Sequence, residues 1–232
     1  MHLLIPAAGS GRRMESDRNK LLLTLLGQPL LAWTLKAAAD ARALDWIGII
    51  AQPKDFPAFQ GILAELTLTI PVQIIQGGET RQQSVYQGLQ ALPPEADQVL
   101  IHDGARCLAS PELFDRCAEA LPQCSGLIAA VPVKDTIKVV GTDGMVQNTP
   151  DRSQLWAAQT PQGFDLALLK QCHERGLKQG WVVTDDAALF EKCGLSVQIV
   201  PGEETNLKLT TPIDLRMAEF ILKERQALKN NP

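Results

Sequence analysis

Along almost the whole chain, short apolar runs that end in turn-forming residues alternate with longer segments of helical periodicity. We expect the runs to be β-strands, over residues 2–6, 46–51, 72–75, 98–102, 126–131 and 196–200. Strands that alternate with helices in this way build a mostly parallel, twisted sheet with helices on both faces. The sequence therefore predicts an α/β fold.

Capping residues mark the helix starts. Ser110 and Thr211 each precede a proline, which combines a good N-cap with a first helical position that needs no N–H. We expect the last helix over residues 212–223, followed by a frayed tail. Two apolar stripes at helical spacing accompany these signals, one formed by Val85, Leu89 and Leu92 and one by Ile213, Met217, Phe220 and Ile221.

The composition excludes several classes of protein. The chain has 232 residues and a net charge of −4, so bulk positive charge cannot drive binding to nucleic acid. No apolar run approaches the roughly 20 residues of a membrane span, and no secretory signal pattern precedes the first strand. Five cysteines without a CxxC pair fit neither a disulfide framework nor a zinc site. We expect a cytoplasmic protein with reduced cysteines that binds neither nucleic acid nor a membrane.

Residues 133–159 break the alternation of strands and helices. They hold a strand-like run, a Gly-Thr-Asp-Gly turn and a polar return, which is typical of a β-hairpin. An isolated hairpin is marginally stable in water, so a long arm of this kind needs a surface to lie on. We expect one domain over residues 1–232, with a β-arm at about 133–159 that joins two copies into a homodimer.

The first predicted strand leads into a loop of small residues, which begins Ala7, Ala8, Gly9, Ser10, Gly11. Small residues let backbone N–H groups approach a ligand, and open α/β sheets bind ligands at the carboxyl ends of their strands. The loop is neither a dinucleotide fingerprint nor a P-loop, but Arg12, Arg13 and Lys20 supply cations that suit a polyphosphate. A tight turn with solvated cations explains the same residues.

Two further strand ends carry polar residues. Gly78, Arg81 and Ser84 follow the third predicted strand, and Asp103, Gly104 and Arg106 follow the fourth. A carboxylate just past a buried strand can hold a Mg²⁺–phosphate unit or a ribose hydroxyl, and an arginine can clamp an oxyanion. The alternative for Asp103 and Arg106 is a structural ion pair.

The sequence contains no pattern for covalent catalysis. It has neither a GxSxG nucleophile elbow nor a zinc-spaced group of histidines. We interpret His102 as a buried core residue, and Thr184 as a helix N-cap followed by Asp185 and Asp186 in the first turn. The chemistry to expect is the positioning of substrates and the stabilisation of charge.

Nine short strings occur in order along nearly the whole chain: AAGSGRRM, NKLL, GGETRQQSV, HDGAR, PVKDT, DR at residues 151–152, QTPQ, VTDDAA and NLKLT. In this combination the chain resembles the 2-C-methyl-D-erythritol 4-phosphate cytidylyltransferases of the non-mevalonate isoprenoid pathway. The resemblance implies a Rossmann-like nucleotidyltransferase fold with a dimer-forming β-arm. It also implies the transfer of a cytidylyl group from CTP to methylerythritol phosphate, with Mg²⁺ and with release of pyrophosphate.

The resemblance further implies roles for individual residues. The triphosphate loop would comprise Ala7, Ala8, Gly9, Gly11, Arg13 and Lys20. The cytidine pocket would comprise Gly78, Arg81 and Ser84, with Gly104 beside them. The methylerythritol-phosphate side would comprise Asp103, Arg106, Thr136, Arg152, Thr184 and Lys208, of which Thr136 and Arg152 reach the partner subunit's site from the arm. Arg13, Lys20 and Lys208 would be the catalytic cations, and Mg²⁺ would be held mainly by the CTP triphosphate, with no protein ligand assigned to it.

Four positions depart from the family's commoner residues: Asn19 where proline is usual, Glu79 for Asp, Gly104 for Ala and Cys107 for Pro. An asparagine at position 19 is expected to loosen the approach to Lys20, and no departure removes a phosphate-binding cation. Two alternatives stand beside the main prediction. One is a CTP:ribitol-5-phosphate cytidylyltransferase, whose first loop tends to read AGG. The other is a non-catalytic nucleotide-binding protein of the same fold, which has no need of a complete set of cations.

Overall fold

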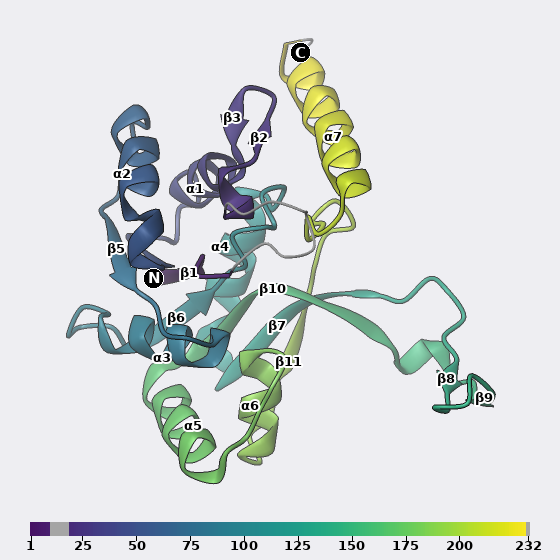
Figure 1. Ribbon diagram of the computed structural model, residues 1–232. Coiled ribbons are helices and arrows are strands. Elements are labelled where there is room, and N and C mark those ends of the chain that lie inside the picture. Colours follow the sequence, from purple (N-terminus) through teal and green to yellow (C-terminus); the bar gives the residue numbers. More distant parts are fainter. Residues whose placement is uncertain (10–18, 231–232) are drawn as a thin grey trace.

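The computed structural model describes residues 1–9 and 19–230 and places seven strands in one twisted sheet (Figure 1). Across the sheet the order is β11, β7, β10, β6, β1, β4, β5. Along the chain these strands are β1 (His2–Pro6), β4 (Trp46–Ala51), β5 (Val72–Gln76), β6 (Gln98–Ile101), β7 (Gly126–Pro132), β10 (Trp156–Asp165) and β11 (Gln198–Pro201). All six strands that the sequence predicts are present, and the α/β fold is confirmed.

Strand β10 is the element of the sheet that the sequence analysis missed in part. The predicted arm ends at residue 159, whereas β10 continues to Asp165 and lies between β6 and β7, antiparallel to both. The other neighbouring pairs of the described sheet are parallel. Pro161 explains why the strand was not predicted, because a proline within a run normally argues against a central strand. The ladder accommodates it through a register shift between Ala158 and Gln162.

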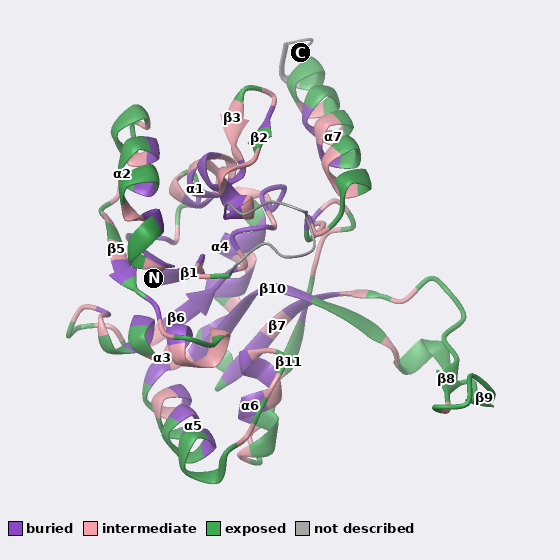
Figure 2. Cartoon of the chain, in the orientation of Figure 1, coloured by how far each residue is buried: buried purple, intermediate pink, exposed green. Residues whose placement is uncertain are grey.

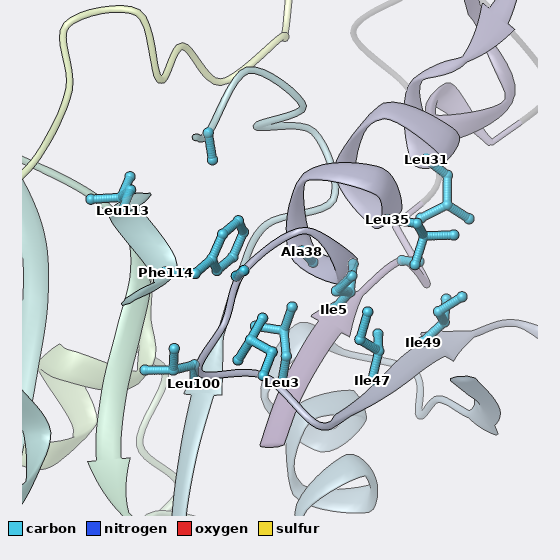
Figure 3. Packing of buried hydrophobic residues seen from close by; sticks show 14 of the residues in the cluster. Leu3, Ile5, Leu31, Leu35, Ala38, Ile47, Ile49, Leu100, Leu113 and Phe114 are labelled. Carbon is cyan, nitrogen blue, oxygen red and sulfur yellow. The ribbon is translucent and has the colours of Figure 1, made fainter. Parts of the chain in front are cut away.

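Helices cover both faces of the sheet, as predicted. On one face lie α1 (Leu30–Ala39), α2 (Phe56–Glu65) and α4 (Pro111–Ala120), and on the other α3 (Arg81–Gln90), α5 (Leu166–Gln179) and α6 (Asp186–Lys192). Successive residues of a strand point to opposite faces, so Leu3 and Ile5 pack under α1 and α4 while Leu4 packs under α3. Figure 3 shows the first of these two cores, with Phe114 of α4 facing Leu3 and Leu100.

The helix starts predicted at Ser110 and Thr211 are confirmed, and at the start of α7 the Thr211 hydroxyl accepts a hydrogen bond from the N–H of Asp214 at 3.4 Å. The Ser110 hydroxyl accepts a hydrogen bond from the N–H of Leu113 at 3.1 Å, with Pro111 at the first helical position of α4. Thr80 caps α3 through a reciprocal capping box with Gln83. Such caps satisfy N–H groups that the first turn of a helix leaves without partners. The start of α3 is therefore fixed where the chain leaves β5.

The last helix, α7 (Pro212–Asn230), is longer than predicted and packs differently. Its predicted apolar face is wrong for three of four residues, because Ile213, Met217 and Phe220 are 58%, 47% and 66% exposed. The fourth, Ile221, packs against a third cluster, in which the helix buries Ala218 and Leu222. This cluster includes residues of the small hairpin formed by β2 (Thr24–Leu25) and β3 (Gln28–Pro29). Apolar residues lie on more than one side of α7, so spacing alone could not identify the buried side.

The expected β-hairpin arm is present. Strands β8 (Val139–Val140) and β9 (Val146–Asn148) pair antiparallel at the end of a long projection from the body of the molecule (Figure 1). Figure 2 shows this projection as almost entirely exposed. Five of its apolar side chains are exposed to solvent, namely Ile137, Val139, Val140, Met145 and Val146.

All five cysteines are free thiols, and burial raises the pKa of Cys107 and of Cys117 to about 12, which makes these two thiols unreactive. Within residues 1–9 and 19–230, no helix is long and apolar enough to cross a membrane.

The first prediction concerns the core. Phe114 is fully buried, so Phe114→Ala should lower the free energy of unfolding by about 3–5 kcal/mol, through lost burial and the cavity left behind. Phe220→Ala makes the same chemical change at an exposed position and should cost less than about 0.5 kcal/mol. Urea denaturation of both variants measures the difference, and equal losses would contradict this placement of the two rings.

Candidate active site

The site is a cavity of about 740 Å³ at the carboxyl ends of the parallel strands, within the size range of small-molecule sites. Segments far apart in the sequence line it. The lining residues that the sequence analysis predicted are Ala7, Ala8, Gly9, Lys20, Gly78, Arg81, Ser84, Asp103, Gly104 and Lys208. Gly11 and Arg13 lie outside the described residues. The cavity therefore unites most of the predicted nucleotide-binding residues with two of the three predicted catalytic cations.

The end of β1 forms one wall of the cavity. The backbone N–H of Ala7 donates to the carbonyl oxygen of Ile50 at 2.7 Å, so the chain still follows β4 at that point. Among the described residues, nothing lies within 4 Å of a Cβ atom built on Gly9, so none of them fills the space beside its backbone.

A second wall is the turn from β5 into α3. The N–H of Gly78 donates to Ser84 Oγ at 3.1 Å, and Gln52 Nε2 donates to the Gly78 carbonyl at 2.8 Å. A Cβ atom on Gly78 would lie 2.6 Å from Gln83 Cβ, so this turn requires glycine. These bonds fix the backbone that faces the cavity.

Arg81 is held at the cavity wall by a buried carboxylate. Its Nη2 lies 2.8 Å from Asp186 Oδ2, and Asp186 Oδ1 lies 3.2 Å from His173 Nε2. Burial acts to raise the pKa of Asp186, but the positive charge of Arg81 and the contact with His173 outweigh it, so the pKa lies below its ordinary value. Asp186 is thus ionised at neutral pH. Its carboxylate holds the guanidinium group of Arg81 in one orientation.

Asp103 lies at the centre of the site's charges. Its Oδ2 is 2.7 Å from Lys208 Nζ and 3.9 Å from Arg106 Nε. Burial acts to raise the pKa of Asp103, but Lys208 and the arginines outweigh it and lower the pKa below its ordinary value. Lys20 Nζ donates to the carbonyl oxygen of Leu209 at 3.4 Å, which brings the second predicted lysine beside the first. Lys20 and Lys208, from opposite ends of the chain, therefore line one cavity together with Asp103.

Arg106 lies outside the cavity lining and connects separate segments of the chain by hydrogen bonds. Its Nη1 donates to the carbonyl oxygen of Asn206 at 2.7 Å, and its Nη2 donates to that of Ala158 at 3.2 Å. These bonds attach the loop after β6 to the segment before Lys208. In this structure the guanidinium group of Arg106 contacts protein backbone.

The remaining predicted residues lie away from the cavity. Thr136 and Arg152 are exposed on the arm, where Arg152 Nη1 donates to the carbonyl oxygen of Lys134 at 2.7 Å. Thr184 is also exposed, and its predicted capping role is wrong by one residue. The N-cap of α6 is Asp185, whose side chain accepts from the N–H of Ala188. Thr184-Asp185 offers two adjacent capping residues, and the sequence pattern does not discriminate between them.

The sequence analysis missed several residues that line the cavity, namely Asn19, Gln52, Lys54 and Asp55. Three of them follow β4, which was predicted correctly. Since ligands bind at the carboxyl ends of strands, the polar segment after that strand was the available signal. The packing at Gly104 favours glycine, because a Cβ atom there would lie 2.7 Å from Leu21 Cδ1.

His102 is fully buried, as interpreted from the sequence, and burial lowers its pKa to about 4. Its Nε2 faces the carbonyl oxygen of Arg106 at 3.1 Å and therefore carries the proton. Its Nδ1 accepts from the hydroxyl of Thr160, which in turn accepts from the N–H of Asp103 at 3.0 Å. The neutral imidazole thus supports the backbone of Asp103.

A mostly parallel sheet with a cavity at its strand ends, lined by small residues and cations, is the arrangement expected of an enzyme that binds phosphorylated substrates. The family model for 2-C-methyl-D-erythritol 4-phosphate cytidylyltransferase matches residues 1–224, so the chain belongs to that family. Relatives of that name from Synechocystis and Nostoc are 67% identical over 227 residues and 70% identical over 225 residues. These alignments cover 98% and 97% of this chain, and 99% of each relative.

Solved structures agree with the family. A 4-diphosphocytidyl-2C-methyl-D-erythritol synthase from Anaerococcus prevotii has a TM-score of 0.85 and 34% identity, covering 96% of this chain and 97% of that one. The 2-C-methyl-D-erythritol 4-phosphate cytidylyltransferase from Thermus thermophilus has a TM-score of 0.77 and 32% identity, covering 95% and 98%. The resemblance and the class of enzyme expected from the sequence are confirmed, and the ribitol-phosphate and non-catalytic alternatives are not favoured.

The second prediction concerns His102 and pH. An unfolded histidine binds a proton below about pH 6.5, whereas folded His102 does so only near pH 4. Stability should therefore be complete above pH 6.5 and fall by roughly 3 kcal/mol between pH 6.5 and pH 4 through this residue alone. His102→Gln should flatten that part of the profile in urea denaturation from pH 7 to pH 4. An unchanged slope would show that the imidazole is not buried in its neutral form.

Proposed function

We propose that the protein transfers the cytidylyl group of CTP to 2-C-methyl-D-erythritol 4-phosphate, giving 4-diphosphocytidyl-2-C-methyl-D-erythritol and pyrophosphate in isoprenoid precursor biosynthesis. The observation that carries the proposal is the convergence of Lys20, Lys208 and Arg81 on one cavity at the strand ends. Two polyanionic substrates repel each other, and a cluster of cations is what can bring them together.

The residues divide into four groups by proposed role. The triphosphate is bound by Ala7, Ala8, Gly9 and Gly11, and the cytidine by Gly78, Arg81, Ser84 and Gly104. The methylerythritol phosphate is bound by Asp103, Arg106, Thr136, Arg152 and Thr184. The catalytic cations are Arg13, Lys20 and Lys208.

The reaction needs no general base. The attacking atom is a phosphate oxygen of methylerythritol phosphate, which is already anionic at neutral pH. It attacks the α-phosphorus of CTP in line with the departing pyrophosphate. Lys20 and Lys208, with Arg13, neutralise the charge that accumulates on the α-phosphate oxygens, and this effect is larger inside a cavity than in water.

A divalent metal fits this site as a companion of the nucleotide. Within the described residues, no group of three His, Cys, Asp or Glu side chains could hold a metal ion. Asp103 is a carboxylate of the cavity lining, at the centre of the cations. Mg²⁺ would accordingly be held mainly by the triphosphate, with Asp103 as the candidate protein ligand, and would supply further neutralisation of phosphate charge.

The arm supports a proposal about assembly. Thr136 and Arg152 lie on a projection that exposes several apolar side chains, and exposed apolar surface of this kind marks an interface. We propose that one cytidylyltransferase domain, comprising residues 1–232, forms a cytoplasmic homodimer in which each arm brings these two residues to its partner's cavity. Nucleic acid and membranes have no part in this assembly.

The third prediction tests the catalytic lysines. Lys20→Ala and Lys208→Ala should each lower kcat by roughly 10²–10³-fold, because each removes a charge that acts on the transition state. The KM for CTP should change far less. Lys223→Ala removes an exposed lysine of α7 and serves as the matched control. Pyrophosphate release from CTP and methylerythritol phosphate measures both parameters, and near-normal turnover of both lysine variants would refute the assignment.

The fourth prediction tests the arm. Arg152→Ala should raise the KM for methylerythritol phosphate by about 10- to 100-fold, as expected for the loss of a charged hydrogen bond. Lys138→Ala, on the same arm, is the control. If arms complete partner sites, mixing Lys20→Ala and Arg152→Ala chains restores activity at methylerythritol phosphate concentrations far below the KM of the arm variant, since each heterodimer holds one intact site. After full exchange, about a quarter of the wild-type activity should return. No recovery would mean that each arm serves its own chain.

A further inference from the structure

The side chain of Asn19 makes three hydrogen bonds although it lies in the cavity wall. Its Nδ2 donates to the carbonyl oxygen of Ala7 at 2.7 Å and to Asp55 Oδ2 at 2.9 Å, and its Oδ1 accepts from the N–H of Leu21 at 3.1 Å. Asn19 is 4% exposed and Asp55 is 8% exposed. The expectation that an asparagine here loosens the approach to Lys20 is therefore wrong.

The orientation of this amide follows from its partners. An amide nitrogen has two donors and an amide oxygen only accepts. Ala7 and Asp55 both offer acceptors, whereas Leu21 offers a donor. Rotating the amide by half a turn would place its oxygen against two other oxygens, so one orientation alone satisfies the site.

The three bonds join segments that carry the nucleotide site. Ala7 follows β1, Asp55 belongs to the short 3₁₀ turn η3 (Pro53–Asp55) after β4, and Leu21 belongs to the 3₁₀ turn η2 (Lys20–Leu22). Asn19 is the N-cap of η2, and Lys20 is its first residue. The backbone from which Lys20 extends is thus fastened to two strand ends at once. From this base Lys20 Nζ reaches the carbonyl oxygen of Leu209, next to Lys208.

We propose that Asn19, anchored by Asp55, is a positioning residue that holds Lys20 in its place beside the reacting phosphate. The inference rests on the proposed catalytic role of Lys20. It explains how the ammonium group of Lys20 is placed, because a long flexible side chain reaches a fixed point only if its backbone is fixed. Misplacement of a catalytic group by about 1 Å can cost on the order of 10²-fold in rate.

The first experiment asks whether Asn19 acts through Lys20. Asn19→Ala should lower kcat for pyrophosphate release by about tenfold or more, with a smaller change in the KM for methylerythritol phosphate. In the Lys20→Ala background the same substitution should lower kcat by less than about twofold, because residues that act as a unit are not additive. An undiminished effect of Asn19→Ala without Lys20 would overturn the proposal.

The second experiment exchanges the pair. Asn19→Asp faces Asp55 with a second carboxylate and should lower kcat more than Asn19→Ala does, since buried like charges repel. Asp55→Asn in the same chain restores the bond between the two side chains with donor and acceptor exchanged, while the Ala7 carbonyl oxygen still lacks its donor. The kcat of this double variant should therefore exceed that of Asn19→Asp but stay below that of the wild type. Equal activity of the single and the double variant would argue that the Asn19 and Asp55 contact does not position the lysine.

A control variant and the Lys20→Ala variant distinguish failure of the proposed function from failure of the inference about Asn19. Asp115→Asn alters another buried carboxylate, which binds Arg42 and the N–H of Ala43 away from the cavity. It should lower thermal stability without changing kcat. If wild-type protein releases no pyrophosphate, the proposed function fails. If Lys20→Ala abolishes turnover while Asn19→Ala leaves it normal, only the present inference fails.

Discussion

The site depends on one ionised carboxylate that is surrounded by cations. Asp103 follows β6 in the centre of the sheet, and its Oδ2 binds Lys208, a residue more than a hundred positions later in the chain. The N-terminal half supplies the cavity walls, and this ion pair brings the C-terminal segment over them. Because Asp103 is largely buried, the attraction is screened less than a surface pair would be. It therefore holds positive charge at a place where phosphates must meet.

A buried polar network keeps that carboxylate in position. The neutral His102 and the hydroxyl of Thr160 support the amide of Asp103, and Asn206 Nδ2 donates to the carbonyl oxygen of Thr160 at 2.8 Å. Each bond is modest in net energy, but a buried polar group left without its partner is costly. The network thus connects β10, the loop after β6 and the segment before Lys208 as one unit. Arg81 has a comparable support in Asp186.

Much of the fold and part of the site could be predicted from the sequence, for identifiable reasons. Strands such as β1 and β4 are short apolar runs with clear ends, and the turn at Gly78 requires glycine because a Cβ atom there would collide with Gln83. Long-range partners could not be predicted. Nothing local indicates that Asn19 meets Asp55 or that Asp186 lies behind Arg81, because these contacts arise only when helices and strands pack. The end of β10 was not predicted because Pro161 argues against a strand, and the register shift that accommodates this proline cannot be seen in the sequence.

The part of β10 inside the sheet and the tip of the arm are constrained differently. Inside the sheet the strand is paired on both sides, with Gln162 opposite Ile101 and Ile128, so a slip of one residue would turn every side chain to the wrong face. At the far end the turn around Gly141 and Gly144 is bounded only by the two-stranded hairpin. Insertions or deletions at this tip would leave β10 and the chain's own cavity unaltered, and would change only how the arm meets a partner. The strand that enters the sheet must keep its alignment, whereas the length of the arm is set by what it has to reach.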